Sequence, residues 1–298
     1  MQSPRFSGAP RKKPGDPSVQ KTLQEARSAA TFLPTEVLIK DLSKSFGGHA
    51  VLTGIDLQIL RSEMIAIVGP SGCGKTVLLK HIMGTLNPDR GSVSVADHEQ
   101  PGSPLMNLAD LPEERMDEIR MHWAVVFQRN ALFGGTVFEN LALWPREIKR
   151  MPDEEILPRA IQALRDVGLN PDQVLQTKRE SLSGGMAKRV AIARALVMNP
   201  LLILYDEPTS GLDPVAGAQI HDLIARTHEV RTDANIARTS IIVTHDTELL
   251  RRLRPRIVML SEGRVYFDGS FDQFIASELV LIRPYVHQMP LLHERRHE

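Results

Sequence analysis

The feature that most constrains the fold is a glycine-rich loop between an expected strand and an expected helix. Residues 69–76 read Gly-Pro-Ser-Gly-Cys-Gly-Lys-Thr and fit the pattern G-x-x-x-x-G-K-T. The apolar run 64–68 before the loop favours a buried strand, and residues 77–83 after it contain no helix breaker. Chance alone produces the bare pattern in about 1% of chains of this length. A phosphate-binding loop therefore explains the stretch better than a purely structural turn does.

The residue types of this loop suit the phosphates of a nucleotide. Glycines let successive backbone N–H groups turn toward a phosphate, and the helix start adds more N–H groups and a positive dipole end. Lys75 would place its charge on the terminal phosphates, and the Thr76 hydroxyl would ligate Mg²⁺. The expected nucleotide contacts are Gly69, Pro70, Ser71, Gly72, Cys73, Gly74, Lys75 and Thr76.

Composition narrows the class of protein. The 298 residues are enough for one large α/β domain or two small ones. Lysine plus arginine equals aspartate plus glutamate at 36 each, so no global basic bias indicates a nucleic-acid partner. Cys73 is the only cysteine, which excludes an intramolecular disulfide and fits a reducing compartment. No stretch approaches the roughly 18 uncharged apolar residues of a membrane span, and the N-terminus lacks the apolar core of a signal peptide, so we expect a subunit that is soluble by itself.

A second glycine pair precedes another expected helix, over residues 187–199. Ser183 is a natural N-cap, and Gly184 and Gly185 expose backbone N–H groups at the helix start, which makes a second anion site. One chain seldom needs two triphosphate-sized anion sites that face different ways. We therefore expect one of the two sites to be completed by another molecule.

Polar residues end two further expected strands, 201–205 and 240–244. In open α/β sheets, ligands bind at the carboxyl ends of the strands. Asp206 is suited to hold Mg²⁺, and Glu207 could polarise an attacking water. His245 follows the second strand and is expected to contact the terminal phosphate, although a lone histidine is more often structural.

Two aromatic or apolar features admit more than one interpretation. Phe46 lies 23 residues before the phosphate loop, a place that favours stacking on a nucleotide base over plain core packing. Residues 131–144 are unusually apolar for a segment that follows a loop. They could form the core of a helical subdomain, a groove that receives a partner, or both with different residues.

The chain divides by composition into three parts. Residues 1–34 are rich in proline, serine, glycine and basic residues and are expected to be a flexible basic tail, with weak contact to anionic lipid headgroups as the alternative. Residues 35–270 carry the strand and helix patterns, and residues 97–111 within them are expected to be a surface loop. Residues 271–298 form a C-terminal extension, in which 279–298 are expected to be a solvated tail with His287, His293 and His297.

Together these stretches resemble the nucleotide-binding subunit of an ATP-binding cassette (ABC) transporter from about residue 35 to residue 268. The matching motifs occur in order: Phe46, the loop 69–76, Gln128 at the Q-loop place, the signature 182–186, Asp206-Glu207, the D-loop 210–213 and His245. The resemblance implies an α/β fold, a P-loop NTPase cassette of ABC type with a RecA-like core. It also implies an antiparallel β subdomain and a helical signature subdomain at about residues 104–200.

The resemblance further implies a head-to-tail homodimer that binds ATP and Mg²⁺. Each ATP would lie between the phosphate loop of one subunit and Ser183, Gly184 and Gly185 of the other. Glu207 would be the general base, while Gln128 and His245 would sense the γ-phosphate, and Thr76, Gln128 and Asp206 would hold Mg²⁺. Integral membrane permease subunits would bind the ATPase at the cytoplasmic face of the inner membrane, and no nucleic acid would be involved. Met186 departs from many relatives, which have glutamine there, so any polar contact from that position is in doubt.

The departure at Met186 also narrows the subfamily. The sequence Leu-Ser-Gly-Gly-Met followed by Lys188-Arg189, with Gln128-Arg-Asn-Ala-Leu-Phe133, resembles the ATPases of MCE-type lipid transporters, which include the Mla system and chloroplast relatives. This implies a complex with a permease pair and MCE substrate-binding proteins that moves phospholipid or another hydrophobic compound across the bacterial envelope. Residues 131–144 lie where the coupling helix of the permease would dock.

Three alternatives remain beside lipid transport. The ATPase of a polar-solute importer, for example for amino acids, would share the same motor. A non-transport ABC ATPase of translation usually carries two cassettes, and one of DNA repair a coiled coil or zinc insertion, whereas this chain has a single motif set and neither insertion. A regulatory scaffold that binds ATP without turnover is disfavoured by Lys75, Asp206, Glu207 and His245. The sequence leaves the substrate and the direction of transport open.

Overall fold

A computed structural model describes residues 34–100, 102–230 and 237–289. From Thr35 onward the chain forms one compact unit. The basic tail expected over residues 1–34 lies almost wholly outside the described residues. None of the described helices is both long enough and apolar enough to cross a lipid bilayer.

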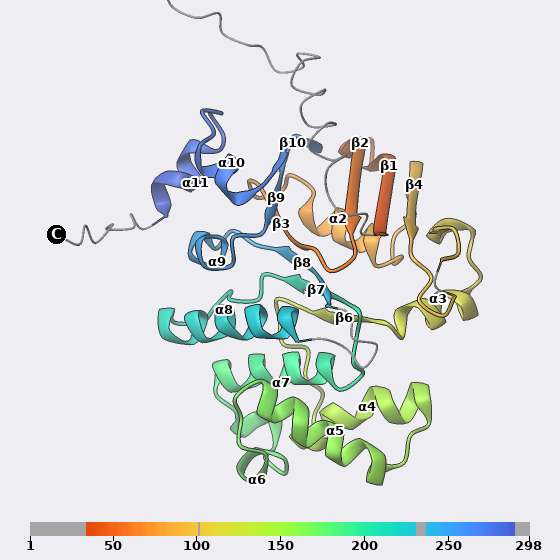
Figure 1. Cartoon of the computed structure of the whole chain (residues 1–298), viewed down its shortest axis with the longest axis vertical. Helices are drawn as coiled ribbons and strands as arrows, with labels where there is room; N and C mark the ends of the chain where they lie inside the picture. The colour runs from red at the N-terminus through yellow and green to blue at the C-terminus, as the bar shows by residue number, and fades with distance from the viewer. Residues whose placement is uncertain (1–33, 101, 231–236, 290–298) are drawn as a thin grey trace, which may run out of the picture. The chain divides into compact units, whose positions relative to one another are not determined.

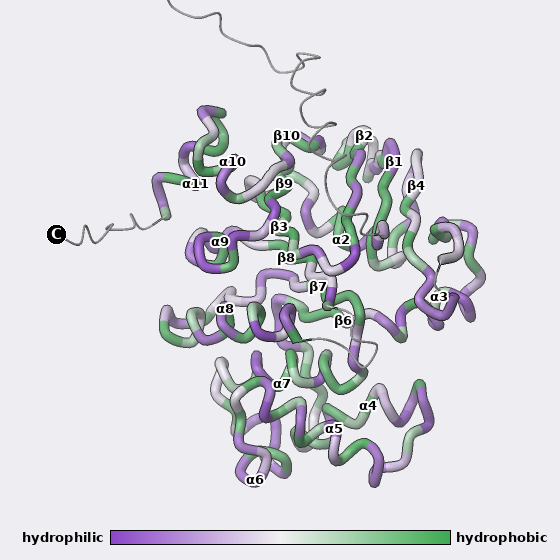
Figure 2. The backbone as a smooth tube through the Cα atoms, viewed as in Figure 1, coloured by the Kyte–Doolittle hydropathy of each residue, from purple (hydrophilic) through white to green (hydrophobic). Residues whose placement is uncertain are grey.

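A six-stranded sheet forms the centre of this unit (Figure 1). Its strand order is β10-β9-β3-β8-β7-β6, with β3 Met64–Val68, β6 Trp123–Val126, β7 Leu202–Asp206, β8 Thr239–Val243, β9 Arg256–Ser261 and β10 Arg264–Gly269. All neighbouring pairs are parallel except β9 with β10, which form an antiparallel hairpin. The parallel strands are short apolar runs because both faces of the sheet are buried, and Figure 2 shows this concentration of hydrophobic residues.

A second, antiparallel sheet of four strands covers one side of the unit. Its order is β2-β1-β4-β5, with β1 Thr35–Phe46, β2 His49–Leu60, β4 Arg90–Val95 and β5 Met106–Asn107. Gly47 and Gly48 make the tight turn between β1 and β2, and both have positive φ angles. The helix α2, Lys75–Ile82, shares one hydrophobic cluster with this sheet and with one face of the central sheet. The expected surface loop 97–111 contains β5 and the 3₁₀ turn Leu108–Asp110, and Leu108 is buried.

Helices fill the region beside and beyond the β6 edge of the central sheet (Figure 1). They include α4 Val137–Lys149, α5 Asp153–Asp166, α6 Pro171–Val174, α7 Gly184–Leu196, α8 Pro214–Glu229 and α9 Thr247–Leu253, and α3 Glu113–Arg120 follows the second sheet in the sequence. A capping box of Thr136 and Glu139 starts α4, so the apolar segment after residue 131 becomes an amphipathic helix. The α/β cassette fold with two sheet regions and a helical layer confirms the fold expected from the sequence.

The C-terminal residues do not form the solvated tail expected over 279–298. The helices α10 Phe271–Ile275 and α11 Arg283–Gln288 are ordered on the unit, Ile282 is fully buried, and Met289 is 8% exposed. The expectation is therefore wrong for residues 279–289. A six-residue helix is too short to show a hydrophobic period, and this is why the sequence pattern missed it. His287 is exposed as expected, whereas His293 and His297 lie outside the described residues.

Candidate nucleotide-binding site

The phosphate loop lies between the end of β3 and the start of α2. Gly74 precedes the helix with φ 102° and gives it no side-chain cap, so the first N–H groups of α2 are not bound by a capping side chain. A Cβ atom at Gly69 would lie 2.3 Å from the Leu260 carbonyl oxygen, and one at Gly74 would lie 2.6 Å from a methyl group of Leu52. Only glycine fits at these two places, and the result is a narrow backbone cradle that suits a phosphate group.

The lysine of the loop is folded onto the loop itself. Lys75 Nζ donates to the carbonyl oxygens of Gly69 at 2.7 Å and Pro70 at 2.9 Å. Burial raises the pKa of the Cys73 thiol, although the charge of Lys75 opposes the rise. The thiol therefore stays protonated and is a packing residue of the loop rather than a nucleophile.

Two acidic residues and a histidine meet at one edge of the central sheet. The strands β3, β8 and β7 are parallel neighbours, so their carboxyl ends lie together, and the Glu207 N–H donates to the Val243 carbonyl oxygen at 2.9 Å. His245 Nδ1 lies 2.8 Å from Glu207 Oε2; the Glu207 side chain is 14% exposed and that of His245 is 69% exposed. Glu207 has a φ of 47°, an uncommon backbone conformation for a residue with a side chain. The structure thus brings together Glu207 and His245, which the sequence placed at the ends of different strands.

The Asp206 carboxylate provides a test of whether a cation fits here. Burial raises the pKa of Asp206, the neighbouring Glu207 raises it further, and Lys188 and Lys75 lower it. Two adjacent carboxylates in a half-buried place are stabilised by a bound cation. No group of three or more His, Cys, Asp or Glu residues arranged for a metal occurs within the described part of the chain. A magnesium ion at Asp206 would therefore need hydroxyl, amide, phosphate or water oxygens as its other ligands, which are ligands that Mg²⁺ accepts.

Gln128 is connected to the D-loop and to the signature helix. Its side-chain amide donates to Ser210 Oγ at 3.1 Å. The Lys188 ammonium donates to the carbonyl oxygens of Phe127 at 3.1 Å and Gln128 at 2.8 Å. Burial lowers the pKa of Lys188, and the charge of Asp206 opposes this. Sequence reasoning missed this structural role, and the available signal was a charged residue inside a helix whose neighbours are almost all apolar or small.

Asp246 joins three segments of the site and was also missed. Its Oδ2 atom accepts hydrogen bonds from Thr209 at 2.7 Å and His221 at 2.8 Å, while Oδ1 caps α9. Burial alone would raise the pKa of Asp246, but these hydrogen bonds and the His221 charge hold it well below the usual range. The contact fixes the turn after Glu207 relative to the turn after His245, and nothing local in the sequence indicates it.

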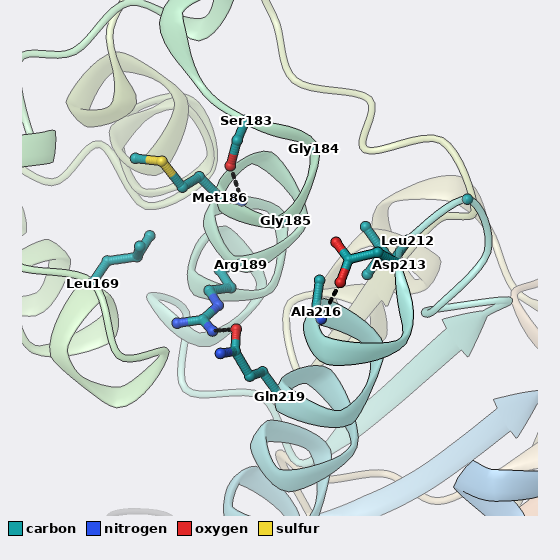
Figure 3. A pocket seen from close by; sticks show the side chains of 11 residues that line it. Leu169, Ser183, Gly184, Gly185, Met186, Arg189, Leu212, Asp213, Ala216 and Gln219 are labelled. Atoms are coloured by element: carbon teal, nitrogen blue, oxygen red, sulfur yellow. Dashed lines mark hydrogen bonds between the residues drawn. The ribbon is translucent and has the colours of Figure 1, made fainter.

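The second glycine pair lines a separate pocket of about 430 Å³ (Figure 3). Ser183 caps α7 by accepting a hydrogen bond from the Met186 N–H at 3.3 Å, and Asp213 caps α8. The lining is Leu169, Ser183, Gly184, Gly185, Met186, Arg189, Gly211, Leu212, Asp213, Ala216 and Gln219. It includes neither the phosphate loop nor Glu207 or His245, so the fold of one chain does not bring the two anion sites into one pocket.

Phe46 ends β1 beside the tight turn, and its ring is exposed rather than part of the core. The Lys44 ammonium lies 5.6 Å from the ring centroid. Because Phe46 is exposed, part of its ring remains accessible beside Lys44, and a planar base could stack on it.

Comparison with known proteins identifies the family. The sequence profile described as "ABC transporter" matches residues 52–210, a little over half of the chain. The L-cystine transport system ATP-binding protein TcyN of Escherichia coli is 38% identical over 241 residues, which cover 80% of this chain and 91% of the relative. The chloroplast protein Trigalactosyldiacylglycerol 3 of Arabidopsis thaliana is 34% identical over 266 residues, which cover 84% and 74%. The intermembrane phospholipid transport system ATP-binding protein MlaF of Haemophilus influenzae is 32% identical over 241 residues, which cover 80% and 86%.

Solved structures agree with the sequence comparison. The protein cbiO1 from Clostridium perfringens, part of the ABC transporter complex cbiONQ, superposes with a TM-score of 0.69 at 29% identity and covers 82% of this chain and 91% of its own. The ATP-binding cassette MJ0796, described as a dimer bound to ADP and Pi, superposes with a TM-score of 0.66 at 31% identity and covers 79% and 98%. The family profile and these relatives show that the chain belongs to the ABC transporter family and is an ATPase subunit of such a transporter.

Proposed function

We propose that this ATPase drives the movement of phospholipid or another hydrophobic compound across the bacterial envelope, in a transporter of the MCE or Mla type. In this proposal the phosphate loop from Gly69 to Thr76 binds ATP, with Phe46 under the base. Glu207 acts as the general base, and His245 Nδ1 lies 2.8 Å from its Oε2 atom. Thr76, Gln128 and Asp206 would hold Mg²⁺, which would neutralise charge on the phosphates.

The active unit in this proposal is a head-to-tail homodimer. A Cβ atom added at Gly184 would meet nothing within 4 Å, and the φ angle of this glycine is not positive, so neither packing nor backbone strain in this chain requires glycine there. A partner that approaches the helix start closely would explain the residue. We infer that Ser183, Gly184 and Gly185 contact the ATP held by the phosphate loop of the second subunit, and the MJ0796 cassette, described as a dimer, supports this.

The permease would bind the surface formed by exposed apolar side chains around α4. Phe127, Phe133, Trp144 and Ile148 are each more than 40% exposed. Arg194 of α7 donates to the Ala131 carbonyl oxygen at 2.9 Å and lies over the Phe133 ring, so the surface is connected to the signature helix. Both interpretations of segment 131–144 therefore receive support, because Leu132, Val137 and Leu141 are buried in the core.

One observation carries the choice of a lipid-type substrate. The two short motifs that resemble the lipid-transport ATPases, 128–133 and 182–189, are in direct contact, since Lys188 binds the Gln128 carbonyl oxygen at 2.8 Å. They therefore form one structural unit, and Phe133 of the first motif belongs to the proposed permease surface. The similarity to MlaF, whose name refers to phospholipid transport, supports this choice.

A polar-solute importer is the second candidate. TcyN, whose name refers to L-cystine transport, is 38% identical to this chain, a higher value than that of MlaF. The two candidates share the same ATPase and differ in the permease and the substrate-binding protein.

Purification of the tagged chain from its native membranes in mild detergent tests the proposal. Mass spectrometry should detect a permease together with an MCE protein and bound phospholipid. A permease with a small-solute binding protein would overturn the lipid assignment, and recovery only with ribosomes or DNA would overturn transport. Trp144→Asp should abolish recovery of the permease, whereas Val230→Asp, at an exposed valine at the end of α8, should not.

A further inference from the structure

A short antiparallel ladder joins the loop before α4 to the segment that leads into the signature motif. The Val137 N–H donates to the Thr177 carbonyl oxygen at 2.9 Å, and the Arg179 N–H donates to the Gly135 carbonyl oxygen at 3.0 Å. The two residues between these bonds, one from each segment, face each other as a β-bridge. Main-chain atoms, whose positions do not depend on side-chain rotamers, therefore hold the two segments together.

The buried Asn140 side chain fixes the loop 131–136 to α4. Its Oδ1 atom accepts a hydrogen bond from the Phe133 N–H at 2.8 Å, and its Nδ2 atom donates to the carbonyl oxygens of Phe133 at 3.1 Å and Thr136 at 2.9 Å. Asn140 is 2% exposed, so these bonds are shielded from water and strengthened by the low local dielectric. The exposed Phe133 ring of the proposed permease surface is thus carried by a loop that is tied to the ladder.

The other side of the ladder lies just before the signature glycines. Arg179 begins a 3₁₀ turn, and Ser183, which caps α7, follows four residues later in the chain. The Leu182 N–H donates to the Arg179 carbonyl oxygen at 3.1 Å and closes this turn. A contiguous series of hydrogen bonds therefore runs from the loop that carries Phe133 to the serine at the start of the signature helix.

We propose that this ladder is the connection through which a permease bound at Phe133 sets the position of Ser183. The proposal rests on the permease surface and on the in-trans ATP site proposed above. The contact of Arg194 with Ala131 acts on the last turn of α7, whereas the ladder acts on the turn before this helix. A movement of the loop would thus shift the start of α7 relative to the ATP of the second subunit. ATP binding by the phosphate loop, which lies between β3 and α2, should not depend on the ladder.

Arg179→Pro removes one bond of the ladder. Proline has no N–H to donate to the Gly135 carbonyl oxygen, and it is tolerated at the first position of a helical turn. Lys178 has φ −72° and ψ 146°, which is the conformation that a residue before proline prefers. Arg179→Ala is the matched control, because it removes the same exposed side chain and keeps the N–H.

The ATPase rate of the transporter, purified from its native membranes and placed in lipid nanodiscs, is divided by the rate of the free chain. This ratio should exceed one for the wild type and for Arg179→Ala. It should fall about five-fold in Arg179→Pro, the factor expected from one backbone hydrogen bond. The free chains should share the same KM for ATP. An unchanged ratio in Arg179→Pro would overturn the connection, and so would an equal fall of both rates, because the bond would then have only a structural role.

A reversible cross-link gives a second readout that does not depend on how well proline is tolerated. Thr136 and Lys178 lie opposite each other, and their neighbours make the two hydrogen bonds, so they are a non-hydrogen-bonded pair. The Cα atoms of such a pair are about 4.5 Å apart, which suits a disulfide.

Oxidation of the variant Thr136→Cys/Lys178→Cys/Arg179→Pro should form an intramolecular disulfide and restore the ratio of rates, and dithiothreitol should lower the ratio again. Both states have the same sequence, so the loss of the Thr136 cap of α4 affects them equally. An oxidised form with the same low ratio as the reduced form would overturn the connection.

Failure of the proposed function gives a different result. A permease that stays bound to Trp144→Asp would overturn the permease surface, on which the connection depends, before any rates are compared. Full activity of Gly184→Ala would overturn the in-trans site. With both of these intact, the ratios in Arg179→Pro and in the cross-linked variant decide on the ladder alone.

Discussion

At the scale of single residues, the side chains that organise the site are not all the ones that would touch ATP. Lys188 is nearly inaccessible to solvent, yet it holds the two carbonyl oxygens that position the Q-loop. The Asp246 carboxylate, which follows His245, binds Thr209 in the turn after Glu207 and also binds His221 of α8. A charge that is shielded from solvent is stabilised by its hydrogen bonds, so both residues fix the loops relative to one another.

Lys188→Met should destabilise the protein and weaken its ATPase activity. The substitution removes the charged donor of two part-buried hydrogen bonds, which lowers the free energy of unfolding by about 1–3 kcal/mol. Urea denaturation and a steady-state ATPase assay measure the two effects. Lys149→Met, at an exposed lysine of α4, is the control and should behave as wild type. Equal stability of both variants would remove the positioning role of Lys188.

At the scale of elements, the glycines at the starts of α2 and α7 are required for different reasons. At the phosphate loop, the chain itself excludes side chains at Gly69 and Gly74. At the start of α7, Gly184 faces open space within its own chain. The first helix start is therefore complete in one subunit, and the second fits a site that a partner completes.

Gly184→Ala should fold normally and lose activity. Alanine meets no atom of this chain and raises helix propensity, so the melting temperature should stay the same or rise slightly. Its methyl group would intrude on the ATP held by the second subunit, and we expect at least a ten-fold fall in kcat. Gly217→Ala in α8, where a Cβ atom also meets nothing, is the matched control for both measurements. Full activity of Gly184→Ala would contradict the in-trans site.

At the scale of the whole molecule, the proposed cycle couples ATP to the association of two subunits. The phosphate loop and the signature pocket are separate in one chain, so each ATP would be enclosed only when two chains meet head to tail. A variant that lacks the general base but keeps the groups that bind ATP should therefore stop after the two subunits have closed around ATP.

Glu207→Gln should therefore bind MgATP but hydrolyse it at least about 100-fold more slowly, and it should accumulate as a dimer. Light scattering with size exclusion should show twice the monomer mass with MgATP and the monomer without it. The double variant Lys75→Ala/Glu207→Gln should stay monomeric because ATP affinity is lost. Wild-type turnover by Glu207→Gln would exclude this residue as the base.

The parts of the fold that the sequence predicted are those set by local chemistry. The strand before the phosphate loop is found at Met64–Val68, as the apolar run indicated, because buried parallel strands need continuous apolar side chains. The capping box that begins α4 is also visible in the sequence, as Thr136 followed three residues later by Glu139. The edge that gathers Glu207 and His245 followed from a general rule, since the carboxyl ends of parallel strands meet.

By itself, the sequence determined the family, the cassette fold and the order of the motifs, because each depends on residues that are neighbours along the chain. Only the tertiary structure decided that Lys188 holds the Q-loop, that Asp246 joins Thr209 and His221, and that residues 279–289 are not a solvated tail. Contacts between such distant positions leave no periodicity or spacing in a single sequence, and they form only when the packing of the core brings their elements together.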